Sequence, residues 1–100
     1  MTYAWDDAKN ELLREVQGIS FEEIVIEIDG GNVVDVLEHP HPGWYPNQQV
    51  YLVRHLDYVF VVPFVRDTER QEIFLKTIYP SRRFTRKYLR TENSDDQATS

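Results

Sequence analysis

The first thirty residues carry two apolar patterns of helical spacing, each with start and stop signals. The first, over residues 8–16, follows aspartates that can cap a helix and precedes a glycine suited to a left-handed stop. The second runs from Phe21 to Ile28 between a capping box and a glycine pair. These signals are Asp6 or Asp7 and Gly18 for the first segment, and Ser20 with Glu23 and Gly30-Gly31 for the second. The pattern predicts two consecutive helices.

Strand-like composition follows in four segments: Val33 to Glu38, Val50 to His55, Tyr58 to Val65 and Glu72 to Tyr79. The third is apolar at nearly every position, which is typical of a strand buried on both faces. Short connections between the strands favour an antiparallel meander. A proline within the third strand, Pro63, lacks a backbone donor, so we expect an irregularity there.

A last helix is predicted from Arg82 to Leu89 or Arg90, with Ser81 as its cap. Phe84 and Tyr88 are spaced i,i+4, so this face should dock on the sheet, with Leu89 extending its edge. The predicted order is α-α-β-β-β-β-α, an α+β fold in which two N-terminal helices precede a four-stranded, mainly antiparallel sheet and a basic C-terminal helix.

The composition fits one small domain. The 100 residues include no cysteine, which excludes disulfides, thiolate zinc sites and a cysteine nucleophile. We expect a single domain over residues 1–90 and a disordered, polar, acidic tail over residues 91–100. No apolar run is long enough to span a bilayer and the first residues do not resemble a secretion signal, so a cytoplasmic protein without membrane contact is expected.

Charge is distributed unevenly along the chain. The net charge is -6, yet residues 76–90 contain six bases and no acid: Lys76, Arg82, Arg83, Arg86, Lys87 and Arg90. Like charges four residues apart repel on a helix, and two arginines stand in the first turn, where the helix dipole disfavours cations. An anionic partner would relieve this repulsion, either RNA phosphates or carboxylates of another protein. A solvated basic face with no ligand is the alternative.

The loop after residue 38 contains a second group of candidate residues. His39 and His41 lie on one side of an extended segment and could bind zinc or nickel together with Asp35, Glu38 or His55. Polar loop residues without a metal are the favoured interpretation, and no metal or cofactor is predicted. The neighbouring aromatic pair, Trp44 and Tyr45, could form a lid on the sheet, a base-stacking platform or a partner anchor.

Three segments of the chain resemble one known family. Residues 3–9 (YAWDDAK) and residues 18–23 (GISFEE) are similar to the paired opening motifs of the BrnT toxins, and the last strand with the basic helix ending at residues 86–88 resembles their closing segment. The resemblance covers about residues 3–90. BrnT toxins are small ribonucleases of bacterial type II toxin–antitoxin pairs with a RelE-like fold.

The resemblance implies a cytoplasmic, RNA-binding endoribonuclease that cleaves RNA without metal and is neutralised by a cognate antitoxin. Family antitoxins typically carry a ribbon-helix-helix part, so DNA contact would come through the partner. The chain departs from the family pattern at Leu13, Val16 and Gln17, where the family usually has an asparagine and a Lys-His pair. It also departs at Ile78, which stands where the family's last strand has an arginine, with Lys76 two residues earlier.

RNA cleavage by attack of the 2′-hydroxyl requires cations and proton-transfer groups. We assign phosphate binding and charge stabilisation to Lys76, Arg82, Arg83 and Arg86, with Lys87 and Arg90 as further RNA contacts. His55 or Tyr79 would transfer protons, and Glu38 is a more remote base. Packing or hydrogen bonding in a strand is an equally good interpretation of these last three residues. The alternative function is a non-catalytic interaction domain, and the apolar third strand indicates a surface covered by a partner or by a second copy in a homodimer.

Overall fold

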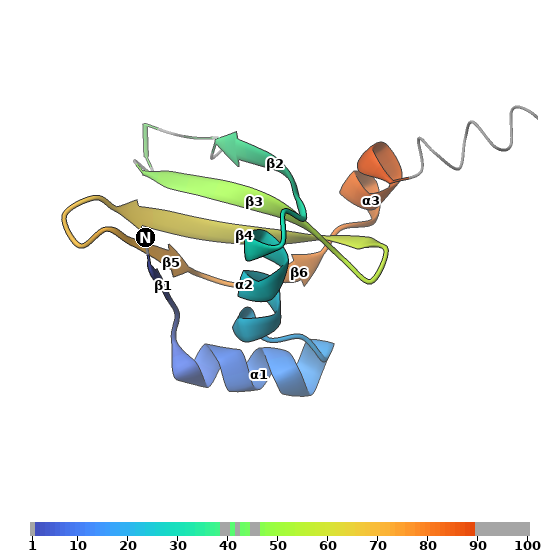
Figure 1. Ribbon diagram of the computed structural model, residues 1–100, viewed down its shortest axis with the longest axis horizontal. Helices are drawn as coiled ribbons and strands as arrows, with labels where there is room; N and C mark the ends of the chain where they lie inside the picture. Colours follow the sequence, from blue (N-terminus) through green and yellow to red (C-terminus); the bar gives the residue numbers. More distant parts are fainter. Residues whose placement is uncertain (1, 39–40, 42, 45–46, 90–100) are drawn as a thin grey trace, which may run out of the picture.

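The computed structural model describes residues 2–38, 41, 43, 44 and 47–89. Within them the chain forms three helices and six strands, which confirms the α+β class. The elements in chain order are β1 (Thr2–Ala4), α1 (Asp7–Gln17), α2 (Phe21–Asp29), β2 (Val33–Glu38), β3 (Gln48–His55), β4 (Tyr58–Asp67), β5 (Glu72–Leu75), β6 (Tyr79–Pro80) and α3 (Arg82–Tyr88) (Figure 1). The tail over residues 91–100 and residue Arg90 lie outside the described residues.

The helix ends follow the predicted signals. The Asp6 side chain accepts the Lys9 amide, and Gly18 ends α1 in the left-handed region at φ 69°. Ser20 and Glu23 form the complete capping box of α2. A buried Asn10 joins the two helices, because its side chain donates to Glu22 at 2.7 Å and accepts the Phe21 amide at 2.8 Å.

The sheet has the strand order β1-β5-β4-β3-β2, and β6 pairs with β4 beyond the end of β5. Strands β2 to β5 form the predicted antiparallel meander. The predicted count of four strands is wrong. β1 pairs in parallel with β5, and it was missed because three residues are too few to show a period. The predicted strand from Glu72 to Tyr79 is divided into β5 and β6.

Pro63 accounts for the division between β5 and β6. β4 continues through this residue, whose carbonyl accepts the Lys76 amide at 2.8 Å. Proline has no N–H to return to Lys76, so the ladder between β4 and β5 ends at Phe64 and Leu75. The expected irregularity therefore falls in the neighbouring strand, and pairing resumes only at β6.

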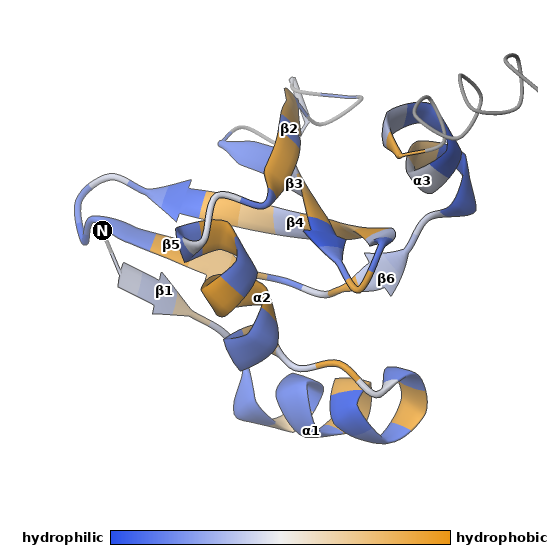
Figure 2. Ribbon diagram, turned by 45° about the vertical axis from the view of Figure 1, so that its right-hand side comes forward, coloured by the Kyte–Doolittle hydropathy of each residue, from blue (hydrophilic) through white to orange (hydrophobic). Residues whose placement is uncertain are grey.

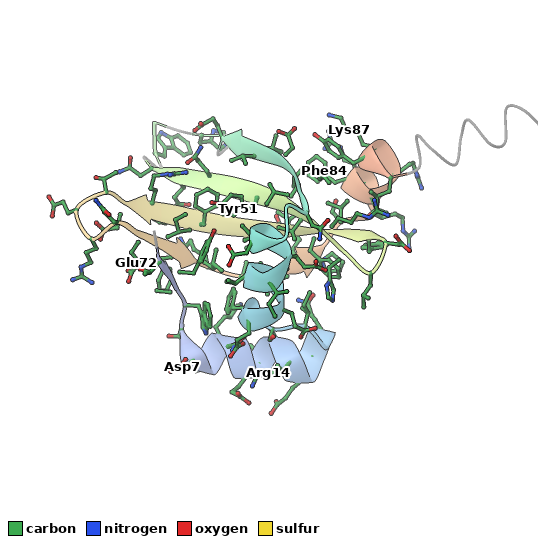
Figure 3. All side chains as sticks on the ribbon, in the orientation of Figure 1. Asp7, Arg14, Tyr51, Glu72, Phe84 and Lys87 are labelled. Atoms are coloured by element: carbon green, nitrogen blue, oxygen red, sulfur yellow. The ribbon has the colours of Figure 1, made fainter. Side chains whose placement is uncertain are left out.

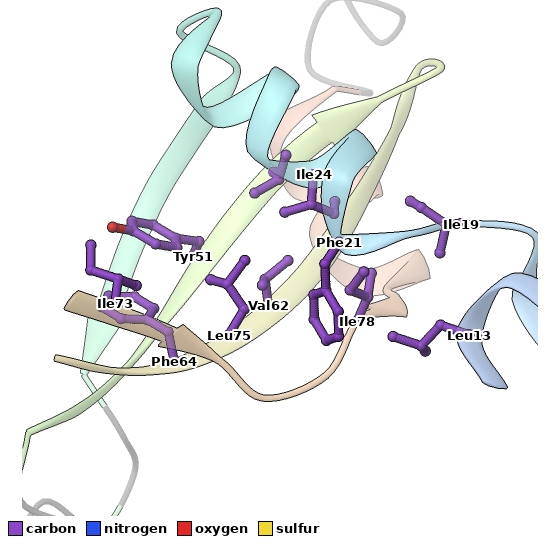
Figure 4. Close-up of a cluster of buried hydrophobic side chains, with 11 residues drawn as sticks. Leu13, Ile19, Phe21, Ile24, Tyr51, Val62, Phe64, Ile73, Leu75 and Ile78 are labelled. Atoms are coloured by element: carbon purple, nitrogen blue, oxygen red, sulfur yellow. The ribbon is translucent and has the colours of Figure 1, made fainter. Parts of the chain in front are cut away.

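Helices pack on both faces of the sheet. α2 covers one face over the larger apolar cluster, which includes Phe21, Ile24, Val62, Phe64 and Ile78 (Figure 4). α3 lies on the other face over a smaller cluster that is centred on Leu52, Val59 and Val61. The central strands β3 and β4 are therefore apolar on both sides, as the composition of residues 58–65 predicts. Figure 2 shows hydrophobic residues, in orange, in both strands. No helix in the described part of the chain is long and apolar enough to span a membrane.

Candidate anion-binding site

Small polar side chains attach the basic helix α3 to the sheet. Ser81 caps the helix by accepting the Phe84 amide at 3.1 Å. The hydroxyl of Thr85 accepts the Val59 amide of β4 at 2.8 Å and donates to the Ser81 carbonyl at 2.7 Å. The Ser81 amide in turn donates to the Val59 carbonyl at 2.9 Å. Both backbone groups of Val59 are thus engaged by α3 and its cap.

A hydrogen bond between Tyr88 and Asp35 ties the other end of α3 to β2. The Tyr88 hydroxyl donates to the Asp35 carboxylate at 2.6 Å, and the second carboxylate oxygen accepts the Val36 amide at 2.8 Å. The bond from Tyr88, helped by the Val36 amide, lowers the pKa of Asp35. The same bond raises the pKa of Tyr88 above its ordinary value. The Asp35 carboxylate and the neutral Tyr88 phenol therefore stabilise each other.

The cations of α3 point to solvent, and one of them, Lys87, lies close enough to Asp35 to help lower the pKa of that carboxylate. Arg82, Arg83, Arg86 and Lys87 are all exposed, whereas Phe84, Tyr88 and the C-cap Leu89 pack against the sheet as predicted (Figure 3). Arg83 lies 5.6 Å from the centre of the Phe84 ring, and the Lys87 ammonium lies 5.4 Å from that of Tyr88. Within the described residues, no carboxylate forms an ion pair with Arg82, Arg83 or Arg86.

Two further predicted residues precede α3. Tyr79 is 46 % exposed and lies in β6 opposite Val61, a residue of the cluster beneath α3. Because paired residues of an antiparallel ladder project to the same face, Tyr79 shares the face of the sheet that carries α3. Lys76 is exposed and follows the last residue of β5. Tyr79 thus stands on the side where the cations gather.

His55 lies on the opposite face of the sheet from α3. Its ring nitrogens are 2.6 Å from Glu27 and 3.7 Å from Glu23, both on α2, and only 14 % of its side chain is exposed. Its ring also meets Phe60 edge-on with centres 5.9 Å apart. The structure therefore does not bring His55 together with the basic helix. Glu38, the remote base candidate, pairs with Gln49 at 3.3 Å near the end of β2.

β2 ends and β3 begins at the end of the sheet away from α3 (Figure 1). His41 stacks on the exposed Trp44 with ring centres 5.0 Å apart, whereas His39 and Tyr45 lie outside the described residues. Across residues 2–38, 41, 43, 44 and 47–89, no group of three or more His, Asp or Glu side chains is placed to hold a metal ion. A role of this loop in stacking would be separate from the cations of α3.

The hydrogen bonds by which Thr85 and Asp35 hold α3 were not predicted from the sequence. Thr85 interrupts a run of basic residues on a helix, and a threonine beside a docking phenylalanine is the one available signal. Asp35 is one of the possible metal ligands in the sequence, whereas the structure joins it to Tyr88. Comparisons with protein-family models, with curated proteins and with solved structures found no match to this chain.

Proposed function

We propose that this protein is a ribonuclease toxin of a type II toxin–antitoxin pair with a RelE-like arrangement, which cleaves RNA without metal and is neutralised by a cognate antitoxin. The observation that carries this proposal is the exposed cationic surface of α3. Its arginines have no carboxylate partner among the described residues, although the chain as a whole is acidic. Such a surface favours an anionic ligand, and the resemblance to BrnT toxins supports RNA as that ligand.

The proposed reaction is attack of an RNA 2′-hydroxyl on the adjacent phosphate. The O2′–P bond forms, the bond from phosphorus to the 5′-oxygen breaks, and negative charge develops on the phosphate oxygens. Arg82, Arg83 and Arg86 would stabilise this charge, with Lys76, Lys87 and Arg90 as further contacts. The Tyr79 hydroxyl would donate a proton to the leaving 5′-oxygen, while the proton of the 2′-hydroxyl passes to solvent.

The attachment of α3 supports this role. Guanidinium groups bind a developing charge best when their scaffold does not have to reorganise. Hydrogen bonds through Thr85 and Tyr88 hold the helix at its middle and at its C-terminal end. The proposed partner is an antitoxin of ribbon-helix-helix type, so that any contact with DNA would be made by the partner.

The position of His55 favours a second candidate function. A histidine held by Glu23 and Glu27 on the far face cannot transfer protons at α3. Without it, Tyr79 is the one predicted proton-transfer residue that shares a face with the cations. A domain that keeps the cationic surface but cleaves nothing would be a protein-interaction module.

A cleavage assay distinguishes the two functions. The purified, antitoxin-free protein is incubated with a defined RNA in EDTA, next to the variants Lys76→Ala, Arg83→Ala and Tyr79→Phe. Arg70→Ala, in the β4–β5 turn far from α3, is the matched control for loss of one exposed arginine. We expect cleavage by the wild type and by Arg70→Ala, and at least a tenfold loss in the other three.

Thermal unfolding of the same proteins separates chemistry from folding. Lys76, Arg83 and Tyr79 lie outside the buried clusters, so their variants should melt close to the wild type. Absence of cleavage by a folded wild-type protein, both alone and with ribosomes, would favour the interaction module. Cleavage that survives the three substitutions would refute the proposed site.

A further inference from the structure

The face of the sheet that carries α3 has an apolar area beyond the helix. Strand register places its members side by side, because Leu37 pairs with Val50, Val50 with Pro63, and Val65 with Phe74. These residues lie on the same face of the sheet as Leu52 and Val61, next to the part that α3 covers. We call this area the open sheet face; it consists of Leu37, Val50, Pro63, Val65 and Phe74.

None of these five side chains is buried by the described part of the chain, and Phe74 is 37 % exposed. α1 and α2 contribute to the cluster on the other face, so they do not cover the open sheet face. Leu37 and Val50 pack at the edge of the cluster beneath α3 and are partly buried there. Single exposed apolar residues are common on proteins, but contiguous ones across four strands mark an interaction surface. The strands involved are β2, β3, β4 and β5.

Opposite charges stand at the two ends of this face. The exposed arginines of α3 lie at one end. At the other end, two acidic residues, Asp67 of β4 and Glu72 of β5, stand opposite each other in the ladder between these strands. Figure 3 shows Glu72 far from α3. Asp67 is partly neutralised by Arg70, whose amide and guanidinium approach it at 3.1 and 3.9 Å, whereas Glu72 makes no ion pair with a described residue.

We propose that the open sheet face binds the same face of a second copy of this chain, in a twofold dimer. A twofold axis through the centre of the face reverses one sheet relative to the other, so that α3 of each copy meets Asp67 and Glu72 of its partner. Apolar side chains then pack on apolar side chains, and each cationic end lies on an acidic end. Stacked sheets lie about 10 Å apart, so the partner's sheet would occupy the layer next to the open sheet face, beside α3.

The tail of the same chain is a poorer occupant of this surface. Residues 91–100 follow α3 and include three acids, but alanine is their one apolar residue. Such a segment could neutralise arginines, yet it has no large side chain to cover Phe74 or Val65. A second copy supplies both the apolar area and the matching charges.

A charge-exchange experiment tests the dimer by sedimentation equilibrium of the full chain. We expect a dimer for the wild type, and a dimer dissociation constant at least tenfold higher for each of Arg83→Glu and Glu72→Arg. The combined variant should recover most of the lost affinity, because the exchanged charges attract again across the axis. Phe74→Ser should also weaken the dimer, whereas Leu12→Ser, at an exposed site on α1, should not.

The dimer pairs the α3 arginines with carboxylates of the partner, so RNA and a second copy would compete for these side chains. Dimerisation and RNA cleavage are measured separately, so the dimer can fail while the ribonuclease proposal holds. A wild-type chain that stays monomeric up to about 0.1 mM would overturn it, since a specific dimer associates more tightly than this. A dimer that Phe74→Ser and the charge reversals leave intact would show that another surface is used. Circular dichroism of each variant confirms that the fold is kept.

Discussion

At the scale of single residues, the tightest backbone constraint is the β3–β4 turn. Leu56 and Asp57 both have positive φ, at 51° and 61°, which is the geometry of a two-residue type I′ hairpin. Asp57 is among the residues that tolerate this region and also pairs with Arg54 at 2.7 Å. The Leu56 side chain does not offset this unfavourable backbone geometry by packing, because it is 85 % exposed. The leucine therefore stores backbone strain in the turn.

Replacing this leucine should stabilise the protein. Leu56→Asn places a residue suited to the left-handed region at the first turn position, and we expect a gain of about 1 kcal/mol in the free energy of unfolding. Urea denaturation measures the change. Leu12→Asn, an equally conservative loss of an exposed leucine on α1, should slightly destabilise the helix. An equal gain in both variants would attribute the effect to lost apolar surface and contradict the strain argument.

At the scale of elements, α3 is a short helix that depends on its anchors. Seven residues are too few for a helix to be stable by itself in water. The Thr85 hydroxyl accepts the Val59 amide at the start of β4, and no side chain of α3 is fully buried. Polar anchors therefore contribute much of what positions the cations.

Thr85→Val should loosen this helix. The valine keeps the shape of threonine but leaves the Val59 amide without its acceptor, at a cost of about 1–3 kcal/mol. Hydrogen exchange of the Val59 and α3 amides should accelerate, while the amides of α2 stay protected. Thr85→Ser retains the hydroxyl and serves as the control. Uniformly faster exchange in every element would contradict a local anchoring role.

The elements also show which features a sequence can predict. Caps and glycine stops act within a few residues, so both N-terminal helices and the start of α3 were predicted closely. β1 and β6 were not, because two or three residues form a strand only when a distant partner is present. The cations of α3 were predicted from the charge pattern alone. The residues of other elements that contact α3 were not predicted.

Asp35 illustrates why the neighbours escaped prediction. Simple alternation from Val33 would put Asp35 on the same face as Val33, under α2. A register shift between these two residues instead places Asp35 opposite Leu52, on the side of α3. Its bond to Tyr88 then joins residues 53 positions apart. Neither the bulge nor the contact leaves a local signal in the sequence.

At the scale of the whole molecule, the bond from Tyr88 to Asp35 connects the C-terminal helix to the edge strand β2. This hydrogen bond is weakened when Asp35 is protonated in acid and when Tyr88 is deprotonated in alkali. Because the pKa of Asp35 is lowered in the folded state, its stabilising effect is present above the unfolded pKa of about 4 and is lost as the pH falls through the folded value. Because the pKa of Tyr88 is raised, its effect is present below about 10 and is lost as the pH rises through the folded value.

Tyr88→Phe should therefore lower stability most between about pH 5 and pH 9, where the wild type has both the carboxylate and the phenol. The difference in melting temperature between the two proteins should narrow in acid and again in alkali. Other groups titrate in the same ranges, since a bond from Asn10 lowers the pKa of Glu22 and burial raises the pKa of Tyr3 and Tyr51. They are common to both proteins and cancel in the comparison. A difference that stays constant from pH 3 to pH 11 would show that Tyr88 acts by packing alone, and that α3 does not depend on this hydrogen bond for its position on the sheet.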